Sequence, residues 1–385
     1  MDTTAALARR FELVTETYPP EINGVALTVQ SLHVGLKALG HDVGLVRPAR
    51  PGELSDESPE LLRVDGAPIP RYPGMRFGLP AGRKLAARWM RQRPDAIYIA
   101  TEGPLGWSAL RAAKRLRIPV ATGFHTRFDD YVGRYGAGFL APWVFAWLRR
   151  FHNRADATLV PTGELVEQLT AQGFRHARRL GRAVDTVRFH PAFRADALRE
   201  QWGVGPDDLA IVHVGRLAPE KNLPLLMRCY EALKVEKPTT KLVLVGDGPE
   251  RPALAAQHPE VIFAGTLRGD ALAAHFASAD LFCFPSLSET FGNVTLEAMA
   301  SGLPTVAFDY GAAREHLRNG VHGAALPFGD ETAFLAHFRD VALSPQRLAM
   351  GHAAREAVEG LSPDRVSRDF ADLLIQLANP LERAA

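Results

Sequence analysis

The hydrophobic positions of the chain repeat one pattern: a short apolar run, a loop, and then a segment with helical spacing. The apolar runs predict buried strands, which in the first half of the chain lie at 11–15, 43–47, 96–100, 119–124 and 158–161. Helical spacing begins near residues 25, 107, 139 and 163. Strands that alternate with helices favour a parallel, doubly wound α/β sheet.

The pattern is interrupted between residues 181 and 208, where glycine, proline and charged residues replace any sustained period. It then resumes, with apolar runs at 209–214, 242–245, 261–264, 281–284, 305–308 and 324–327. We therefore predict two tandem Rossmann-like domains, 1–185 and 186–362, that face each other across a cleft at the carboxyl ends of their strands. A final amphipathic helix is predicted at 363–377.

Composition narrows the class of protein. The chain has 385 residues, 46% of them hydrophobic, which is enough for two domain cores. Its two cysteines, Cys229 and Cys283, have no metal-ligand neighbours in sequence, so buried free thiols are expected and a zinc site is not. No apolar run reaches the ~18 residues of a membrane span, and no signal peptide is evident, so we expect a cytoplasmic protein without membrane-spanning helices.

The net charge of +2 conceals an asymmetry between the halves of the chain. Residues 1–185 contain 26 lysines and arginines against 18 acids, a balance of +8, whereas the remainder balances to −6. The two halves are therefore expected to face different partners or each other.

Two loops at predicted strand ends combine charge with a helix start. In HVGRLAPEKN, residues 213–222, Arg216 and Lys221 flank a turn before a helix, which is a suitable seat for phosphate oxygens; an ordinary solvated turn is the alternative. In SETFGNVTLEAMASGLPTVA, residues 288–307, Glu289 precedes a glycine turn and Glu297 lies in the helix after it. Carboxylates can accept hydrogen bonds from paired sugar hydroxyls, although acids also favour helix N-termini for electrostatic reasons alone.

A third loop, ETYPPEINGV at residues 16–25, follows the first strand, and Gly24 begins a helix whose amides could face an anion. The sequence has no GxGxxG, which disfavours a Rossmann oxidoreductase. Cations and amides for a diphosphate, with acids for sugar hydroxyls, together indicate a nucleotide-sugar site.

These motifs resemble a known family. Glu289 to Glu297 resembles the Glu-x7-Glu motif of retaining family 4 glycosyltransferases in its usual setting, and GlyArgLeu…GluLysAsn is similar to their diphosphate loop. The resemblance runs from residue 11 to about residue 323. It implies a GT-B fold, in which the C-terminal helix, 363–385, packs back on an N-terminal acceptor-binding domain and the second domain binds the donor.

The resemblance also implies roles for single residues. Arg216 and Lys221 would bind the leaving diphosphate, Glu297 the ribose, and Glu289 the donor sugar. His125, in GlyPheHisThrArgPhe, would lie near the transferred sugar; as a lone histidine it could equally be a packed polar residue. The remaining donor contacts would come from Gly24, Gly246, Leu267, Phe291, Gly292 and Asn293.

The sequence and the resemblance also bear on the mechanism and on the acceptor. The sequence has no Asp-x-Asp pair, so neither a cofactor nor a metal is expected, and the cations would bear the diphosphate charge. The resemblance implies front-face retention. The segment 101–136 resembles the branch that contains sulfoquinovosyl-diacylglycerol synthases and bacterial mannosyl- or glucosyltransferases acting on lipids. The acceptor-side candidates are Glu102, Arg127, Asp129 and Tyr131.

Two basic, aromatic segments suggest peripheral contact with an anionic membrane surface, on the cytoplasmic face of the inner membrane. The first, 83–93, could also be a solvated face, and it contains five cations: Arg83, Lys84, Arg88, Arg91 and Arg93. For the second, 139–151, a core helix is the favoured interpretation.

Several alternatives stay open at the level of sequence. The acceptor could be soluble or a polysaccharide, and a GT-B nucleotide-sugar epimerase or a non-catalytic nucleotide-binding protein would share the fold. The sequence does not distinguish a UDP-sugar from a GDP-sugar, and it determines neither the hexose nor the oligomeric state. No feature indicates nucleic-acid binding.

Overall fold

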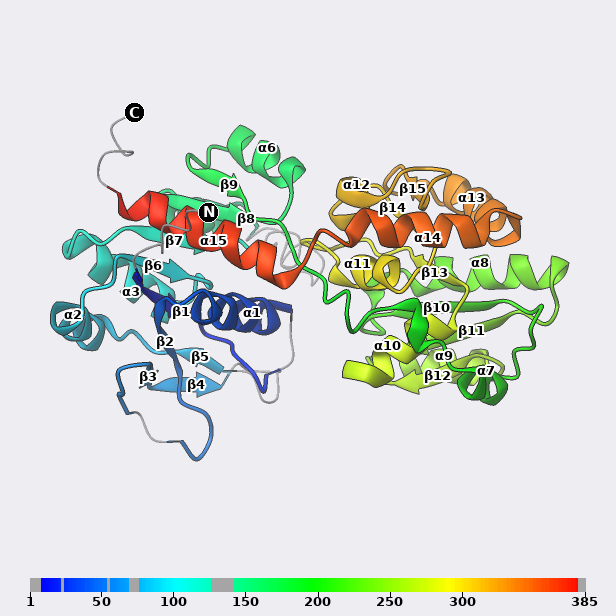
Figure 1. The fold of residues 1–385 in the computed structure, drawn as a ribbon, viewed down its shortest axis with the longest axis horizontal. Coiled ribbons are helices and arrows are strands. Elements are labelled where there is room, and N and C mark those ends of the chain that lie inside the picture. The colour runs from blue at the N-terminus through cyan, green and yellow to red at the C-terminus, as the bar shows by residue number, and fades with distance from the viewer. Residues whose placement is uncertain (1–7, 22–23, 54–55, 69–75, 126–140, 380–385) are drawn as a thin grey trace, which may run out of the picture. The chain divides into compact units, whose positions relative to one another are not determined.

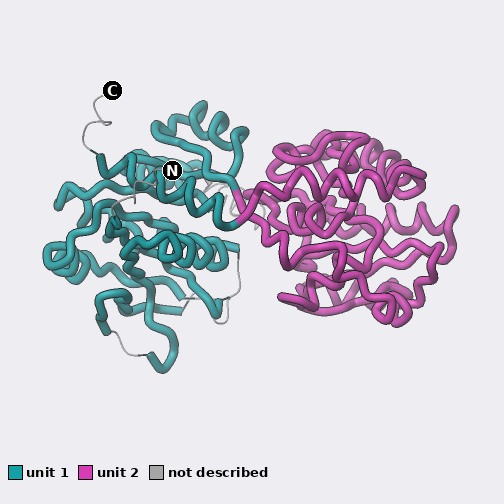
Figure 2. The backbone as a smooth tube through the Cα atoms, in the orientation of Figure 1, with its two compact units in different colours: residues 1–181, 363–385 teal, residues 182–362 magenta. Residues whose placement is uncertain are grey.

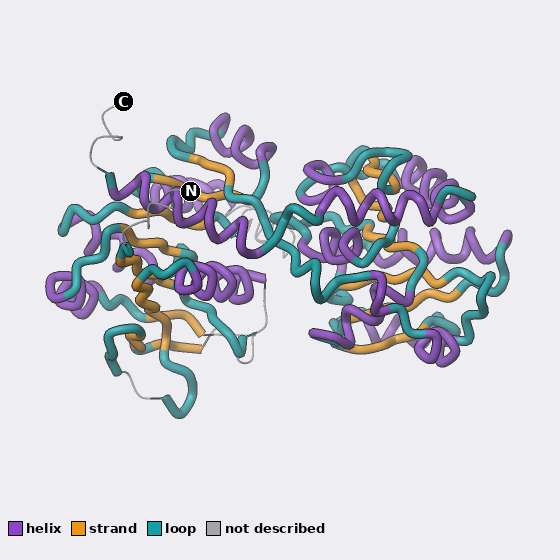
Figure 3. Tube along the Cα trace, viewed as in Figure 1, coloured by secondary structure: helices purple, strands orange, loops and turns teal. Residues whose placement is uncertain are grey.

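The computed structural model describes residues 8–21, 24–53, 56–68, 76–125 and 141–379. The chain forms two compact units, one of residues 1–181 with 363–385 and the other of residues 182–362 (Figure 2). The division after Gly181 lies four residues before the boundary expected from the sequence. In each unit, strands lie between helices (Figure 3).

Unit 1 contains a seven-stranded sheet in the order β3-β2-β1-β6-β7-β8-β9, in which all paired strands are parallel. The strands are β1 (Arg10–Val14), β2 (Asp42–Pro48), β3 (Leu61–Val64), β6 (Ala96–Ile99), β7 (Val120–Gly123), β8 (Ala157–Val160) and β9 (Ala177–Arg179). A separate antiparallel pair joins β4 (Gly66–Pro68) and β5 (Arg76–Gly78). The helices are α1 (Gly24–Ala38), α2 (Gly82–Arg91), α3 (Pro104–Arg115), α5 (Ala141–His152), α6 (Gly163–Ala171) and α15 (Pro363–Ala378).

Two apolar layers cover the faces of this sheet. Alternate strand residues point to opposite faces: Tyr98 packs with α1 and α15, whereas Ile97 and Ile99 pack with α2 and α3. The last helix, α15, lies beside α1 although the whole of unit 2 separates them in sequence (Figure 1). The burial of Phe370, among other residues of α15, therefore completes the core of unit 1 from the far end of the chain.

Unit 2 contains a six-stranded parallel sheet in the order β12-β11-β10-β13-β14-β15. The strands are β10 (Ala210–Val214), β11 (Lys241–Val245), β12 (Ile262–Gly265), β13 (Leu281–Phe284), β14 (Thr305–Phe308) and β15 (Gly323–Leu326). The helices are α7 (Asp196–Trp202), α8 (Leu223–Glu236), α9 (Arg251–Gln257), α10 (Gly269–Ser278), α11 (Asn293–Ala300), α12 (Ala312–His316), α13 (Glu331–Leu343) and α14 (Arg347–Val358). Helices α8 and α13 cover one face, and α10, α11 and α14 cover the other.

The eleven strands expected from apolar runs are all present within one or two residues of their expected ends. The short strands β3, β4, β5 and β9 and the helices α2 and α7 were not expected, because they are too short or too polar to give a periodic signal. Cys229 and Cys283 are both fully buried free thiols, as expected.

Candidate active site

The two loops that follow β10 and β13 bring one predicted cation, Lys221, and one predicted acid, Glu289, together in unit 2. The strand order reverses between these neighbouring strands, and their carboxyl ends thus form the switch point at which open α/β sheets bind ligands. Two hydrogen bonds join the loops: the Leu287 amide donates to the Glu220 carbonyl at 2.8 Å, and the Ser286 hydroxyl donates to the same oxygen at 3.3 Å.

Lys221 and Glu289 form an ion pair where these loops meet, and their side chains are only 13% and 19% exposed. The Ser286 hydroxyl donates to the same Glu289 carboxylate oxygen at 3.0 Å. Lys221 Nζ also lies 5.2 Å from the centroid of the Phe284 ring, close enough for a cation–π contact. The ammonium group is therefore held in place before any ligand arrives, whereas Arg216, in the same loop, is exposed.

The N-terminus of α11 supplies backbone donors beside this pair. Gly292 has φ 90° and ψ 61°, a left-handed conformation that glycine adopts without strain, and it turns the chain into the helix. Phe291 is buried, and its carbonyl accepts a hydrogen bond from the Ala312 amide at 2.7 Å. Asn293 Oδ1 is buried and has no partner among the described residues, so it can accept a hydrogen bond from a ligand.

Glu297 lies on α11 one turn beyond Asn293 and is partly buried. Burial raises the pKa of Glu297 to about 7 because the ionised carboxylate is poorly solvated there. Hydrogen-bond donors on a ligand would stabilise the poorly solvated carboxylate, and the two adjacent hydroxyls of a ribose are such donors.

Gly246 begins the loop after β11, where base contacts were expected. An alanine Cβ at this position would lie 1.9 Å from the Gly215 carbonyl oxygen, and the φ of Gly246 is 139°. Only glycine therefore lets the two loops run side by side. Leu267 follows β12, is partly buried, and packs against the apolar core of the unit.

His213 is a buried polar residue of β10 that the sequence analysis did not single out. Its Nδ1 lies 3.0 Å from the Cys283 carbonyl, so the proton resides on Nδ1 and Nε2 carries a lone pair. Burial lowers the pKa of His213 to about 4, and Nε2 has no partner among the described residues. The sequence feature that could have pointed to His213 is a single histidine inside an otherwise apolar strand. It lies two residues before Gly215, at the start of the loop that contains Arg216 and Lys221.

In unit 1, Gly24 is the first residue of α1, as expected, and a Cβ added to it would meet no atom of the described residues within 4 Å. His125 follows β7, and its Nε2 lies 2.7 Å from the hydroxyl oxygen of Tyr98. This contact fixes one ring nitrogen of His125. The acceptor-side candidates Arg127, Asp129 and Tyr131 lie outside the described residues.

Glu102 is buried, and its carboxylate contacts another side chain of unit 1. Its Oε1 lies 3.2 Å from His152 Nε2, and His152 Nδ1 lies 2.8 Å from the Thr122 hydroxyl, so the three side chains form a buried chain of polar contacts. Nearby, Glu16 accepts a hydrogen bond from the Leu105 amide at 3.0 Å, and burial raises the pKa of Glu16 to about 7. Neither Glu16 nor His152 was expected, because their partners lie 50 residues or more away in sequence.

The basic segment 83–93 does not form a single charged face. Arg88 is 2% exposed and forms an ion pair with the fully buried Glu12 at 2.8 Å, so its inclusion among surface cations was wrong. Its apolar neighbours Leu85 and Trp89 are buried with it. Conversely, α5 is less buried than a core helix would be, because Trp143 and Trp147 are 76% and 41% exposed.

The described residues contain neither a metal-binding cluster nor a membrane-spanning helix. No group of three or more histidine, cysteine, aspartate or glutamate side chains is arranged to hold a metal ion in the described part of the chain. None of the helices built from those residues is long and apolar enough to cross a bilayer.

Comparisons with known proteins agree with the geometry of unit 2. The family model described as Glycosyltransferase Family 4 matches residues 22–188, and the model described as Glycosyl transferases group 1 matches residues 208–342. A GDP-mannose-dependent alpha-mannosyltransferase of Mycobacterium tuberculosis is 35% identical, over 92% of this chain and 93% of the relative.

Further relatives and a solved structure extend the comparison. Sulfoquinovosyl transferase SQD2 of Arabidopsis thaliana is 31% identical over 91% of this chain and 70% of its own, and an alpha-monoglucosyldiacylglycerol synthase of Acholeplasma laidlawii is 26% identical over 77% and 79%. Anabaena Alr3699/HepE in complex with UDP has the same fold, with a TM-score of 0.75 and 18% identity over 95% of this chain and 100% of that one. The chain therefore belongs to glycosyltransferase family 4 and is a glycosyltransferase with the GT-B fold.

Proposed function

We propose that this enzyme transfers a hexose, with retention of configuration, from a nucleotide-diphosphate sugar to a hydroxyl group of a membrane lipid, and that GDP-mannose is its donor. The Lys221–Glu289 pair at the switch point of unit 2 carries the donor part of the proposal, because it sets a fixed cation beside a sugar-binding carboxylate. The name of the Mycobacterium tuberculosis relative supports the choice of GDP-mannose.

Each site residue has a task in this proposal. Lys221 and Arg216 bind the diphosphate, and the amides at the start of α11 add directed donors. Glu297 accepts the ribose hydroxyls, Glu289 and Asn293 contact the sugar, and the loops of Gly246 and Leu267 contact the base. From unit 1, Gly24 approaches the phosphates and His125 lies near the transferred sugar.

The reaction proceeds on one face of the sugar. The bond from the anomeric carbon to the diphosphate oxygen breaks, the acceptor oxygen bonds to that carbon from the same side, and its proton passes to the departing phosphate oxygen. Lys221 and Arg216 stabilise the charge that develops on the diphosphate, so the proposal requires no metal ion. A covalent sugar on Glu289, trapped with a slow substrate, would contradict this route.

A lipid acceptor is supported by two observations. The Acholeplasma laidlawii relative is named for a diacylglycerol product, and α5 of this chain exposes Trp143 and Trp147 beside Arg149 and Arg150. Exposed tryptophans with adjacent cations favour the interface of an anionic bilayer, so we place the enzyme peripherally on the cytoplasmic face of the inner membrane. A soluble or polysaccharide acceptor is the second candidate.

Calorimetry with GDP and UDP, in the presence of a metal chelator, tests the donor site. We expect GDP to bind and Lys221→Met to weaken it by roughly 10- to 100-fold, because one charge-assisted contact to phosphate is worth about 1.5–3 kcal/mol. Lys234→Met is the matched control, since Lys234 also lies near a carboxylate, that of Glu260, but near the far end of α8. Stronger binding of UDP would overturn the choice of donor; equal losses in both variants would overturn the site.

Transfer itself is tested with labelled GDP-mannose and a dispersed lipid extract. Label in the organic phase is the expected result, and label only in water-soluble products would replace the lipid acceptor with the soluble one.

A further inference from the structure

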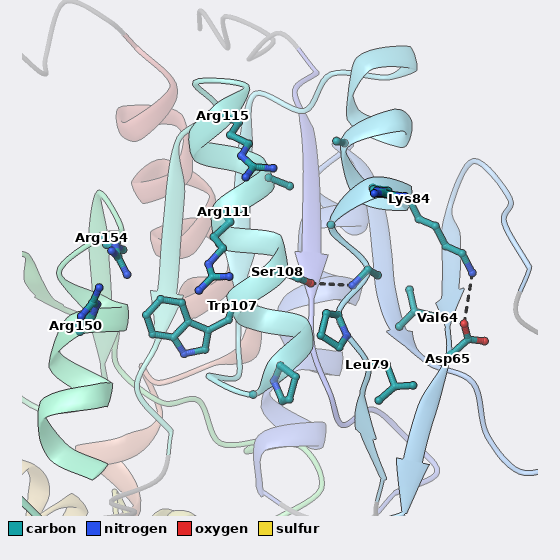
Figure 4. A pocket seen from close by; sticks show the side chains of 18 of the residues that line it. Val64, Asp65, Leu79, Lys84, Trp107, Ser108, Arg111, Arg115, Arg150 and Arg154 are labelled. Carbon is teal, nitrogen blue, oxygen red and sulfur yellow. Dashed lines mark hydrogen bonds and ion pairs between the residues drawn. The ribbon is translucent and has the colours of Figure 1, made fainter. Parts of the chain in front are cut away.

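A cationic groove lies on unit 1, apart from the residues assigned above to the transfer reaction. It has a volume of about 1040 Å³ and is lined by α2, by α3, by the end of α5 and by the segments after β3 and β5 (Figure 4). Six basic side chains line it: Arg83, Lys84, Arg111, Arg115, Arg150 and Arg154. A volume of this size accommodates a small-molecule ligand.

The charge of the groove is almost uncompensated. Among the described residues, Asp65 is the single acidic residue of the lining, and its Oδ2 lies 3.7 Å from Lys84 Nζ. None of the five arginines forms an ion pair with a carboxylate among the described residues, and all five are exposed. Elsewhere in the unit the opposite holds, as in the pairs Arg47–Glu53 and Arg88–Glu12.

The spacing of these arginines places like charges side by side. Arg111 and Arg115 are four residues apart on α3, and therefore lie on the same face of that helix. Arg150 and Arg154 are also four residues apart, at and just beyond the end of α5. Like charges at this spacing repel each other, and a bound anion would relieve the repulsion.

Tryptophan forms an apolar wall between the two arginine pairs. The guanidinium carbons of Arg111 and Arg154 lie 5.7 Å and 5.4 Å from the centroid of the Trp107 ring (Figure 4). Trp147 packs against Trp107 with ring centroids 5.8 Å apart. The indole Nε1 of Trp107 is buried and has no acceptor among the described residues, so the wall also contains an unmet hydrogen-bond donor.

The floor of the groove is tied together by a hydrogen bond. The Ala81 amide, at the start of α2, donates to the Ser108 hydroxyl of α3 at 3.0 Å, and Ser108 in turn donates to the Leu105 carbonyl at 2.8 Å. Helices α2 and α3 pack closely together. The arginines are therefore presented by a preformed surface.

We propose that this groove binds a phosphate ester, with the guanidinium groups of Arg111, Arg115, Arg150 and Arg154 sharing its charge and the two tryptophans contacting its organic part. Guanidinium groups pair with phosphate through two parallel hydrogen bonds, and planar indoles accept the apolar portion of such a ligand. The phosphate could be carried by a free ester in solution or by a lipid headgroup. The groove shares Trp147 and Arg150 with the face of α5 proposed above to contact a membrane, but the proposal depends on unit 1 alone and not on the proposed transfer reaction.

Two probes distinguish these sources: glycerol 3-phosphate, measured by calorimetry, and phosphatidylcholine vesicles with or without phosphatidylglycerol, measured by co-sedimentation. We expect one of them to bind, and Arg111→Gln with Arg115→Gln to weaken that binding roughly tenfold or more. Binding of glycerol 3-phosphate identifies a free ester; binding of phosphatidylglycerol vesicles without glycerol 3-phosphate identifies a headgroup.

The control removes the same charge elsewhere. Arg175 and Arg178 are exposed residues of the same unit, and their side chains pair with no carboxylate among the described residues, so Arg175→Gln with Arg178→Gln should leave binding within roughly twofold. The single substitution Lys221→Met should also leave binding of the probe unchanged, which would show that the probe does not bind at the donor site. Equal losses in the two double variants, or no binding of either probe, would overturn the proposal.

Folding of the groove variant is checked by thermal unfolding. Because the substitution removes repulsion between two arginines, we expect its midpoint to equal or exceed that of the wild type. Arg111→Lys with Arg115→Lys keeps the charge but not the paired hydrogen bonds, and should retain an intermediate affinity.

Discussion

The raised pKa of Glu297 predicts that nucleotide affinity depends on pH. In the free enzyme the pKa of this carboxyl is about 7, because burial disfavours its ionised form. Ribose hydroxyls donate hydrogen bonds to the ionised carboxylate, so a bound nucleotide favours deprotonation. Below pH 7 the proton must leave before the nucleotide binds, and affinity should fall.

The magnitude follows from linkage. If the bound form is fully ionised, the apparent dissociation constant increases by a factor of one plus ten raised to the difference between the pKa and the pH. With a pKa of about 7, affinity should drop about tenfold between pH 8 and pH 6 and be nearly constant above pH 8. Because the bound nucleotide lowers the pKa of Glu297, the affinity for nucleotide decreases as the pH falls.

Calorimetric titration of GDP into wild type and Glu297→Gln across this range is the assay. The glutamine keeps the shape of the side chain but has no proton to lose, so its affinity should be weaker at pH 8 and should change less with pH. The phosphate of the nucleotide titrates near pH 6 itself, and the comparison with the variant removes that contribution. Equal pH dependence in both proteins would refute the reasoning.

A control guards against unfolding of the variant. Since burial disfavours the ionised carboxylate, Glu297→Gln should be no less stable than the wild type at pH 8. Urea unfolding at that pH measures this.

Two further substitutions test the fold around the sites. Gly246→Ala should lower the free energy of unfolding by about 3 kcal/mol or more, because its Cβ would meet the Gly215 carbonyl. Gly265 also has a positive φ, but no described atom lies near its added Cβ, so Gly265→Ala should cost only about 1 kcal/mol. Equal losses in urea titrations would contradict the clash argument. Arg88→Met leaves the buried Glu12 without its partner and should lower the free energy of unfolding by about 3–5 kcal/mol, measured by chemical denaturation. Arg91 is exposed, so Arg91→Met is the control and should stay within about 1 kcal/mol of wild type.

The candidate donor site could be predicted from sequence because its residues lie in two short, continuous loops. Lys221 belongs to one and Glu289 to the other, and each loop follows a strand whose apolar run is unmistakable. Their neighbourhood followed from a general property of parallel sheets, whose adjacent strand ends lie together. The ion pair between them could not be read from the pattern, since the two residues are 68 positions apart in sequence.

The hydrophobic pattern by itself determined the parallel α/β architecture of both units, because the period of apolar positions is a local property that each segment carries. Tertiary structure alone decided which charges are buried: Arg88 reads as a surface cation until Glu12, 76 residues away, is packed against it. The same holds for Glu102 with His152, and for the arginines of the groove, which α3 and α5 bring together from distant parts of the chain. Burial and charge pairing depend on which segments meet in space, and no local pattern records that.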